Sequence, residues 1–201
     1  MKISKYTDRD QWLEARKGKI TGSRVKDLIV KRGTGRKKGF YELIAERIAT
    51  PPTGENPMER GNRLESEALE KFIADTGKKV DTSLVIWHRD DDEDIAISPD
   101  GFMGETEAVE VKCLNSASHI EAYLTNEIPS EYQDQAIQYF VVNDKLEKLY
   151  MVFYDPRIMY KDYFVIEVTR ESVREKVTEY LTYEKQVMEE VTKIVNELVG
   201  F

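Results

Sequence analysis

The sequence predicts an α/β fold in which helices flank a mixed central β-sheet. Apolar residues recur at three- and four-residue steps near both ends of the chain, whereas several short apolar stretches in its middle are typical of strands. A chain of 201 residues without repeats or a clear linker fits one domain with a sizeable core. We therefore expect residues 1–201 to form a single domain with a basic segment over 1–40, a core over about 60–168 and a final helix over about 171–198.

Helices are predicted where the apolar period is close to 3.6 and where capping or stop residues bound the pattern. Pro51 and Gly77 are stop residues, and Pro129 is a start residue. The expected helices are a short segment from Trp12, one carrying Val25 to Ile29, one over Tyr41–Ile48, one over about 60–76, one from Pro129 through Phe140, and the C-terminal one.

Strands are predicted between these helices, where the period changes. The expected strands are Lys79–His88, Ile95–Ser98, Ala108–Leu114, Leu149–Tyr154 and Tyr163–Val168. Turns are expected over 90–94 and 101–105 and at Asp155-Pro156. This order of elements places one mixed sheet inside an α/β domain.

Composition excludes several classes of protein. The single cysteine, Cys113, rules out a disulfide framework, a four-cysteine zinc site and a cysteine-bound iron–sulfur cluster. No apolar run approaches the ~20 residues of a membrane span, and the charged start does not resemble a signal peptide. We expect a soluble, cytoplasmic protein.

The charge is distributed unevenly along the chain. Residues 1–40 contain 13 Lys and Arg against 4 Asp and Glu, whereas residues 41–201 contain 17 against 34, and the formal net charge is −8. This asymmetry favours a basic face for a polyanion on an acidic body. A solvated surface with clustered charges is the alternative. The Lys31–Lys38 loop has the same two interpretations: backbone phosphate contacts, or a solubilising loop.

The residues with the clearest chemistry are Asp100, Glu110 and Lys112. Asp100 lies at a predicted turn, and Glu110 and Lys112 point to one face of the next strand because side chains alternate. In a hairpin, two carboxylates and one ammonium would converge. Two adjacent carboxylates attract a hard divalent cation such as Mg²⁺, and the carbonyl of Val111 could add an oxygen ligand.

Such a group of residues fits phosphodiester hydrolysis, in which the lysine holds a water or neutralises developing charge. The same pattern also fits an exposed hairpin with an Asp-Gly turn and an ordinary Glu–Lys pair.

Five segments, in order, resemble the phage lambda exonuclease family, the YqaJ-like viral recombinase nucleases of the PD-(D/E)XK superfamily. Matching segments are WLEARKGKITGS (12–23, with Gly22 in place of the family's alanine), ERGNRLES (59–66), SPDG (98–101) with EVKC (110–113), DQAIQYFVVN (134–143) and YDPR (154–157). The resemblance covers nearly the whole chain and implies the restriction-endonuclease-like core with its mixed sheet.

The resemblance also implies roles for individual residues. Asp100, Glu110 and the Val111 carbonyl would be metal ligands, Glu65 an additional acidic ligand, Lys112 the catalytic lysine and Gln138 the active-site glutamine. Mg²⁺ would be the cofactor, with Mn²⁺ as a substitute. Gln135 forms with Tyr139 a Q-x-x-x-Y pattern like that of RecB-type nucleases and is a candidate DNA contact. A plain helix surface is the alternative for both glutamines.

Arg16, Ser23 and Ser98 match the family's 5′-phosphate-binding positions, which suits guanidinium and hydroxyl chemistry. A surface ion pair for Arg16 and a helix cap for Ser23 are the alternatives. The family's arginine downstream of its E-L-K-C falls here near Ser118 and His119, and Tyr123 and Arg157 are candidate replacements.

The resemblance implies a Mg²⁺-dependent 5′→3′ exonuclease on double-stranded DNA that leaves 3′ single-stranded overhangs for recombination by strand annealing. It also implies a homotrimeric ring and a single-strand annealing protein as partner. Two alternatives remain: a structure-specific or restriction-type endonuclease with the same core, and a non-catalytic DNA-binding module.

Overall fold

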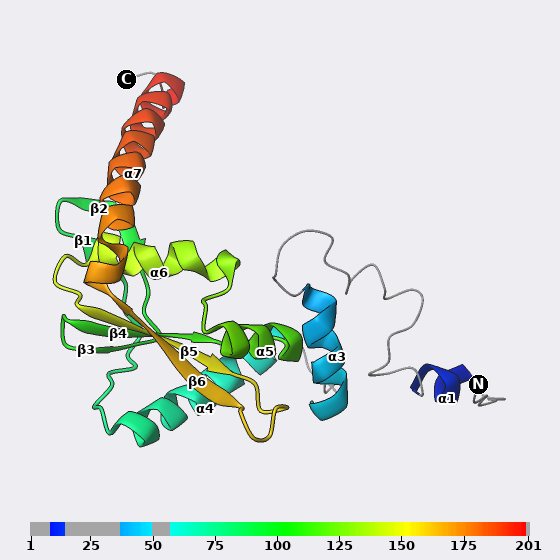
Figure 1. Ribbon diagram of the computed structural model, residues 1–201. Coiled ribbons are helices and arrows are strands. Elements are labelled where there is room, and N and C mark those ends of the chain that lie inside the picture. Colours follow the sequence, from blue (N-terminus) through cyan, green and yellow to red (C-terminus); the bar gives the residue numbers. More distant parts are fainter. Residues whose placement is uncertain (1–8, 15–36, 50–56, 200–201) are drawn as a thin grey trace. The chain divides into compact units, whose positions relative to one another are not determined.

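The computed structural model describes residues 9–14, 37–49 and 57–199 (Figure 1). The predicted helix at Val25–Ile29, most of the Lys31–Lys38 loop, Arg16 and Ser23 lie outside these residues. The helices are α1 (Arg9–Glu14), α3 (Lys38–Ile48), α4 (Pro57–Thr76), α5 (Ser116–Thr125), α6 (Ser130–Val142) and α7 (Arg170–Val199). The strands are β1 (Trp87–Arg89), β2 (Asp92–Ile97), β3 (Gly101–Met103), β4 (Glu107–Lys112), β5 (Lys148–Tyr154) and β6 (Tyr163–Thr169).

The chain divides into two compact units. The first unit comprises residues 1–64, 113–127 and 153–164, and the second comprises 65–112, 128–152 and 165–201. The expected single domain stays a prediction. No helix among the described residues is long and apolar enough to cross a membrane.

The central sheet has the strand order β3-β4-β5-β6. β3 and β4 form an antiparallel hairpin in which Gly101 pairs with Val109. The connection from β4 to β5 passes through α5 and α6, the kind of crossover that joins parallel neighbours. The predicted mixed sheet with flanking helices is therefore confirmed.

The core of the second unit forms around β5. Within this unit every residue from Leu149 to Val152 is buried, as expected for a strand covered on both faces. From α4, Ala68, Leu69 and Phe72 are buried, and the Phe72 ring lies 5.1 Å from that of Tyr150. In the first unit, α3 and α5 pack around Tyr41, Ala117, Ile120 and Ile158.

The hairpin that carries the candidate carboxylates differs from the predicted one. β2 pairs with β1 through a tight turn at Asp90 and Asp91, so it is β3 that faces β4. The β3–β4 turn lies at Gly104, whose φ of +63° is easily adopted only by glycine. Gly101 is instead inside β3, where an added Cβ would lie 2.6 Å from a side-chain carbon of Val80. The close approach of the Val80 segment therefore explains this glycine.

Two further differences concern missing and added elements. The predicted strand Lys79–His88 is reduced to β1 and one bridge between Asp81 and Phe102. Helix α5 was not predicted, although Asn115 caps it by accepting a hydrogen bond from Ser118 N at 3.0 Å. Asn126 ends it in a left-handed conformation with φ of 54°. Both asparagines are ordinary capping residues, so the signal was present in the sequence.

Helix α6 carries the candidate glutamines, and its orientation is fixed by contacts at its C-terminal end. α6 packs against α7, β1 and β2. The Arg170 guanidinium, at the start of α7, donates to the carbonyls of Phe140 (3.2 Å), Asn143 (2.5 Å) and Leu146 (2.7 Å). These carbonyls at and just after the end of α6 are groups that a cation commonly satisfies. Arg170 thereby holds the end of α6 against the start of α7.

Candidate active site

Asp100 and β4 are joined by a side-chain-to-backbone hydrogen bond. The amide N of Val111 donates to Oδ2 of Asp100 at 2.7 Å. Because Gly101 pairs with Val109 across the hairpin, Asp100 lies beside Glu110 and Val111. The structure thus brings together Asp100, which the sequence placed at a turn, and Glu110 of the next strand, and both belong to the second unit.

Glu110 is buried, with 4% of its surface exposed, and its carboxylate accepts three side-chain hydrogen bonds. Lys112 Nζ lies 2.5 Å and Gln135 Nε2 lies 2.8 Å from its Oε1. The Tyr139 hydroxyl donates to its Oε2. Three donors from two elements fix the position of this carboxylate, since charge-assisted hydrogen bonds are stronger than neutral ones.

Burial and mutual repulsion raise the pKa of two carboxyl groups at the site. Burial, with the nearby Glu110 as the second cause, raises the pKa of Asp100 to about 7. Burial and Glu110 also raise the pKa of Glu65, while Lys112 acts in the opposite direction. Glu65, Asp100 and Glu110 therefore influence one another electrostatically, and one ammonium only partly compensates for them.

The chemistry of these donors fits a hard divalent cation. Carboxylate and carbonyl oxygens are the ligands that Mg²⁺ prefers, and a cation would relieve the repulsion that raises the pKa of Asp100. Among the described residues, no three Asp, Glu, His or Cys side chains already stand in a metal-binding arrangement. Glu110 instead accepts hydrogen bonds from its three donors, and Asp100 accepts one from Val111 N.

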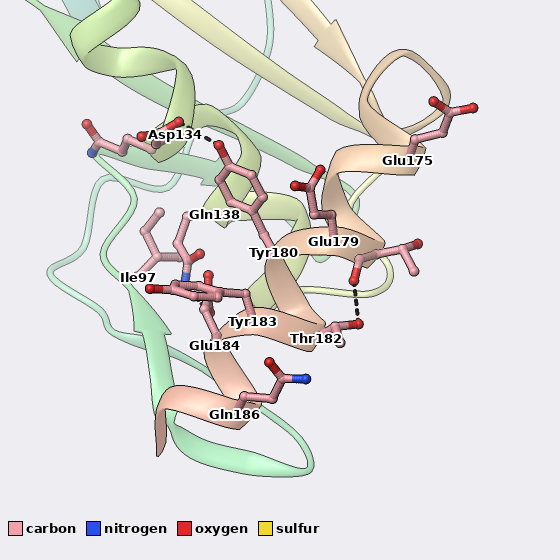
Figure 2. Close-up of a pocket in the computed structure, with 12 residues that line it drawn as sticks. Ile97, Asp134, Gln138, Glu175, Glu179, Tyr180, Thr182, Tyr183, Glu184 and Gln186 are labelled. Atoms are coloured by element: carbon pink, nitrogen blue, oxygen red, sulfur yellow. Dashed lines mark hydrogen bonds between the residues drawn. The ribbon is translucent and has the colours of Figure 1, made fainter. Parts of the chain in front are cut away.

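The two candidate glutamines of α6 lie in different surroundings. Gln135 donates to Glu110, whereas Gln138 Nε2 donates to Glu184 Oε2 of α7 at 3.1 Å. Figure 2 shows Gln138 beside Glu184 of α7. Both glutamines line a pocket of about 1160 Å³ together with residues of α7. Gln135, expected only as a DNA contact, is thus the glutamine that touches the carboxylates, and Gln138 is not brought to them.

One face of α6 lies against Glu110 and Lys112. Tyr132, Gln135 and Tyr139 are separated by three and four residues and therefore lie on one side of the helix. The Tyr132 ring faces Lys112 Nζ, with 4.8 Å between the ring centroid and the nitrogen. Sequence reasoning missed Tyr132, although this spacing was the signal that could have identified it.

Ser98 is the one candidate phosphate-binding residue that lies within the described part of the chain. It is exposed, and its carbonyl accepts a hydrogen bond from the Tyr139 hydroxyl at 3.4 Å. Ser98 comes two residues before Asp100, and the hydroxyl of Tyr139 that contacts its carbonyl also donates to Glu110.

Arg157, a candidate replacement for the absent arginine, is occupied within the first unit. Its Nε and Nη2 donate to both oxygens of Asp155 at 2.7 and 3.0 Å, and Asp155 is completely buried. Ser116 Oγ also donates to Asp155, at 2.5 Å. The guanidinium therefore neutralises a buried aspartate, which gives the YDPR segment a structural role.

Tyr123 and His119 lie in helix α5, near the position of the family's absent arginine. The Tyr123 ring contacts Phe164 at 5.5 Å and lies below Lys161 Nζ at 5.6 Å. His119 is buried and contacts the carbonyl of Lys161 through Nε2 at 2.8 Å, and its Nδ1 has no hydrogen-bond partner among the described residues. Burial lowers the pKa of His119, so it does not replace the arginine's positive charge.

The PD-(D/E)XK fold is defined by a mixed sheet, by acidic residues beside two adjacent strands, and by a lysine two positions after the second acidic residue. Residues 11–145 match the YqaJ-like viral recombinase domain, and the chain belongs to this family. No curated protein gives a significant match.

Two solved structures of one protein are similar over almost the full length. One is an alkaline exonuclease, LHK-Exo, from Laribacter hongkongensis, with 27% identity, a TM-score of 0.56, and coverage of 94% of this chain and 99% of that chain. The other is LHK-Exo in complex with dAMP, with 26% identity, a TM-score of 0.62, and coverage of 95% and 98%. Together with the family, these matches identify the chain as a nuclease, a phosphodiester hydrolase, and not a non-catalytic module.

Proposed function

We propose that this nuclease is a Mg²⁺-dependent exonuclease that digests the 5′-ended strand of double-stranded DNA. The observation that carries the proposal is the cluster of Asp100, Glu110 and Lys112 around the Val111 amide. The similar protein LHK-Exo is named an alkaline exonuclease and was crystallised with dAMP, a mononucleotide of the kind that exonucleases release. Its name supports the same activity for this chain.

Asp100, Glu110 and the carbonyl of Val111 would hold the metal ion, and Glu65 would contribute a further carboxylate. When bound, Mg²⁺ supplies an activated water and polarises the phosphodiester. Gln135 and Tyr139 keep Glu110 in one orientation through their hydrogen bonds. Lys112 provides a positive charge close to the carboxylates, where negative charge develops on the phosphate during hydrolysis.

End selection is assigned to a phosphate-binding group formed by Arg16, Ser23 and Ser98. A guanidinium and two hydroxyl groups can grip a terminal 5′-phosphate. Held beside the carboxylates, such a phosphate would present the adjacent phosphodiester for hydrolysis, and each cleavage would produce a new 5′-phosphate. The product would be a 3′ single-stranded overhang, the substrate for recombination by strand annealing.

The active form is proposed to be a homotrimeric ring that passes its product to a single-strand annealing protein. Family membership supports this part of the proposal. Sedimentation at working concentrations is the measurement, and a monomer with full processive activity would contradict the ring. Co-purification with a candidate annealing protein would test the partner.

Digestion of end-labelled linear duplex tests the activity directly. With Mg²⁺ or Mn²⁺, mononucleotides should be released from the 5′-ended strand only, and EDTA should stop the reaction. Ca²⁺ should permit binding with little turnover, because its looser coordination orients the reacting groups poorly. Release from the 3′-ended strand, or turnover in EDTA, would overturn the proposal.

Site variants connect the activity to the cluster. Glu110→Gln and Lys112→Ala should each lower the rate by several orders of magnitude while the protein stays folded. Glu105→Gln, a change at an exposed carboxylate in the β3–β4 turn, is the matched control and should keep the wild-type rate. The endonuclease alternative predicts cleavage of covalently closed circular duplex, which an exonuclease leaves intact.

A further inference from the structure

Among the described residues, the Lys112 ammonium makes close contact with one carboxylate and one aromatic ring. The ammonium lies 2.5 Å from Glu110 Oε1 and 4.8 Å from the centroid of the Tyr132 ring. Only 16% of the Lys112 side chain is exposed to solvent. The carboxylate and the ring therefore replace much of the water around the ammonium. An ammonium over an aromatic face is attracted by the negative face of the ring, more strongly where water is excluded.

The two partners act on the lysine in different ways. Glu110 accepts an N–H of Lys112 and is shared with Gln135 and Tyr139, so its oxygens serve several donors at once. The Tyr132 ring uses no oxygen lone pair and consumes no conventional N–H donor of the ammonium. The ring can therefore hold the charge in place while the N–H groups that Glu110 does not accept remain available to a phosphate.

The orientation of Tyr132 follows from the helix that carries it. Tyr132 lies in the first turn of α6, three residues before Gln135 and seven before Tyr139. Gln135 and Tyr139 donate to Glu110 from one face of α6, and the same face presents the Tyr132 ring to Lys112. Because Arg170 fixes the end of α6, the ring and the carboxylate partners are positioned as one rigid set.

We propose that Tyr132 is a positioning residue for Lys112: its ring holds the ammonium over the carboxylate cluster through a cation–π contact. The inference rests on the proposed function for its effect on hydrolysis, but the contact itself can be measured without DNA or metal. A lysine with four rotatable side-chain bonds otherwise has many orientations, and the ring limits them.

Nuclear magnetic resonance tests the contact in the metal-free protein. Protons on the Cε of Lys112, bonded to the Nζ that lies over the ring, should resonate upfield of those of exposed lysines because of the ring current. The shift should persist in Tyr132→Phe and Tyr132→Trp and disappear in Tyr132→Leu. Lys112→Arg identifies the signal. A Lys112 resonance at the ordinary position in the wild-type protein would overturn the proposal whatever the activity.

Kinetics test the consequence. Tyr132→Leu should lower kcat by about 3- to 30-fold with KM for duplex DNA unchanged, and Tyr132→Phe should restore kcat. Tyr183→Leu, at a tyrosine of α7 with 67% exposure, is the control and should leave kcat unchanged. An unchanged kcat in Tyr132→Leu, or an equal loss in Tyr132→Phe, would contradict the positioning role.

The two measurements separate the inference from the proposed function. If the wild-type protein shows the upfield shift but does not digest duplex DNA, the proposed function fails and the contact stands. If Tyr132→Leu does not fold, the wild-type shift and the Phe and Trp variants still decide the question. The proposal is supported if Tyr132→Phe and Tyr132→Trp both keep the upfield shift and the wild-type kcat. It is refuted if both variants lose the shift, or if both lose kcat.

Discussion

Asp100→Asn should stabilise the metal-free protein while it abolishes hydrolysis. In the folded chain burial and Glu110 raise the pKa of Asp100 to about 7, from an ordinary value of 3.8. The unfolded chain therefore loses this proton near pH 4, whereas the folded chain keeps it until about pH 7. Between these values the folded state binds more protons, so the free energy of unfolding falls as the pH rises.

The magnitude follows from this difference in pKa. Each pH unit corresponds to about 1.4 kcal/mol, which gives an upper limit of ~4 kcal/mol at pH 8. Because Asp100 keeps part of its contact with solvent, we expect a gain of ~2–4 kcal/mol for Asp100→Asn at pH 8, and less than half of that gain at pH 5. Asparagine keeps an acceptor oxygen for Val111 N, so the hydrogen bond to β4 need not be lost.

Urea unfolding in EDTA at pH 5 and pH 8 measures this gain. Asp94→Asn, at an exposed aspartate of β2, is the matched control and should change the free energy of unfolding by less than ~0.5 kcal/mol. Added Mg²⁺ should stabilise the wild-type protein, and should stabilise Asp100→Asn much less if Asp100 is a ligand. A variant no more stable than wild type at pH 8, or equally stabilised at both pH values, would refute the reasoning.

Three further predictions concern stability and end selection. Arg157→Ala should lower the free energy of unfolding by ~3–5 kcal/mol, because it removes the cation that neutralises the fully buried Asp155. In the same denaturation assay the control Lys145→Ala, which removes an exposed ion pair with Glu105, should cost less than ~1 kcal/mol. Burial lowers the pKa of His119 below 6.5, so the unfolded chain gains this proton first and the free energy of unfolding should fall as the pH drops below about 6.5. His119→Gln should remove this pH dependence, and an unchanged slope in the variant would exclude His119 as its source. Arg16→Ala should slow processive digestion of 5′-phosphorylated duplex far more than that of 5′-hydroxyl duplex at matched salt, whereas equal loss on both would indicate general backbone binding.

Local chemistry made much of the fold predictable from the sequence. The β5 and β6 strands and helices α4, α6 and α7 lie within a few residues of their expected bounds, because long apolar-periodic runs, the stop at Gly77 and the start at Pro129 determine them locally. Pairing of strands was not predictable in the same way. Whether β2 or β3 faces β4 depends on contacts between segments far apart in sequence, such as the approach of Val80 to Gly101.

The candidate chemistry could be recognised without a structure, from the spacing of Asp100, Glu110 and Lys112, from the acidic Glu65, and from a family resemblance that the comparisons confirm. Which α6 residues face that chemistry depends on how the helix packs. Gln135 and Gln138 are three residues apart and so are neighbours on the helix surface, and no local rule distinguishes them. The rotation of α6, fixed by its packing on α7, β1 and β2, turns Gln135 toward Glu110 and Gln138 toward Glu184, and brings the Tyr132 ring to Lys112.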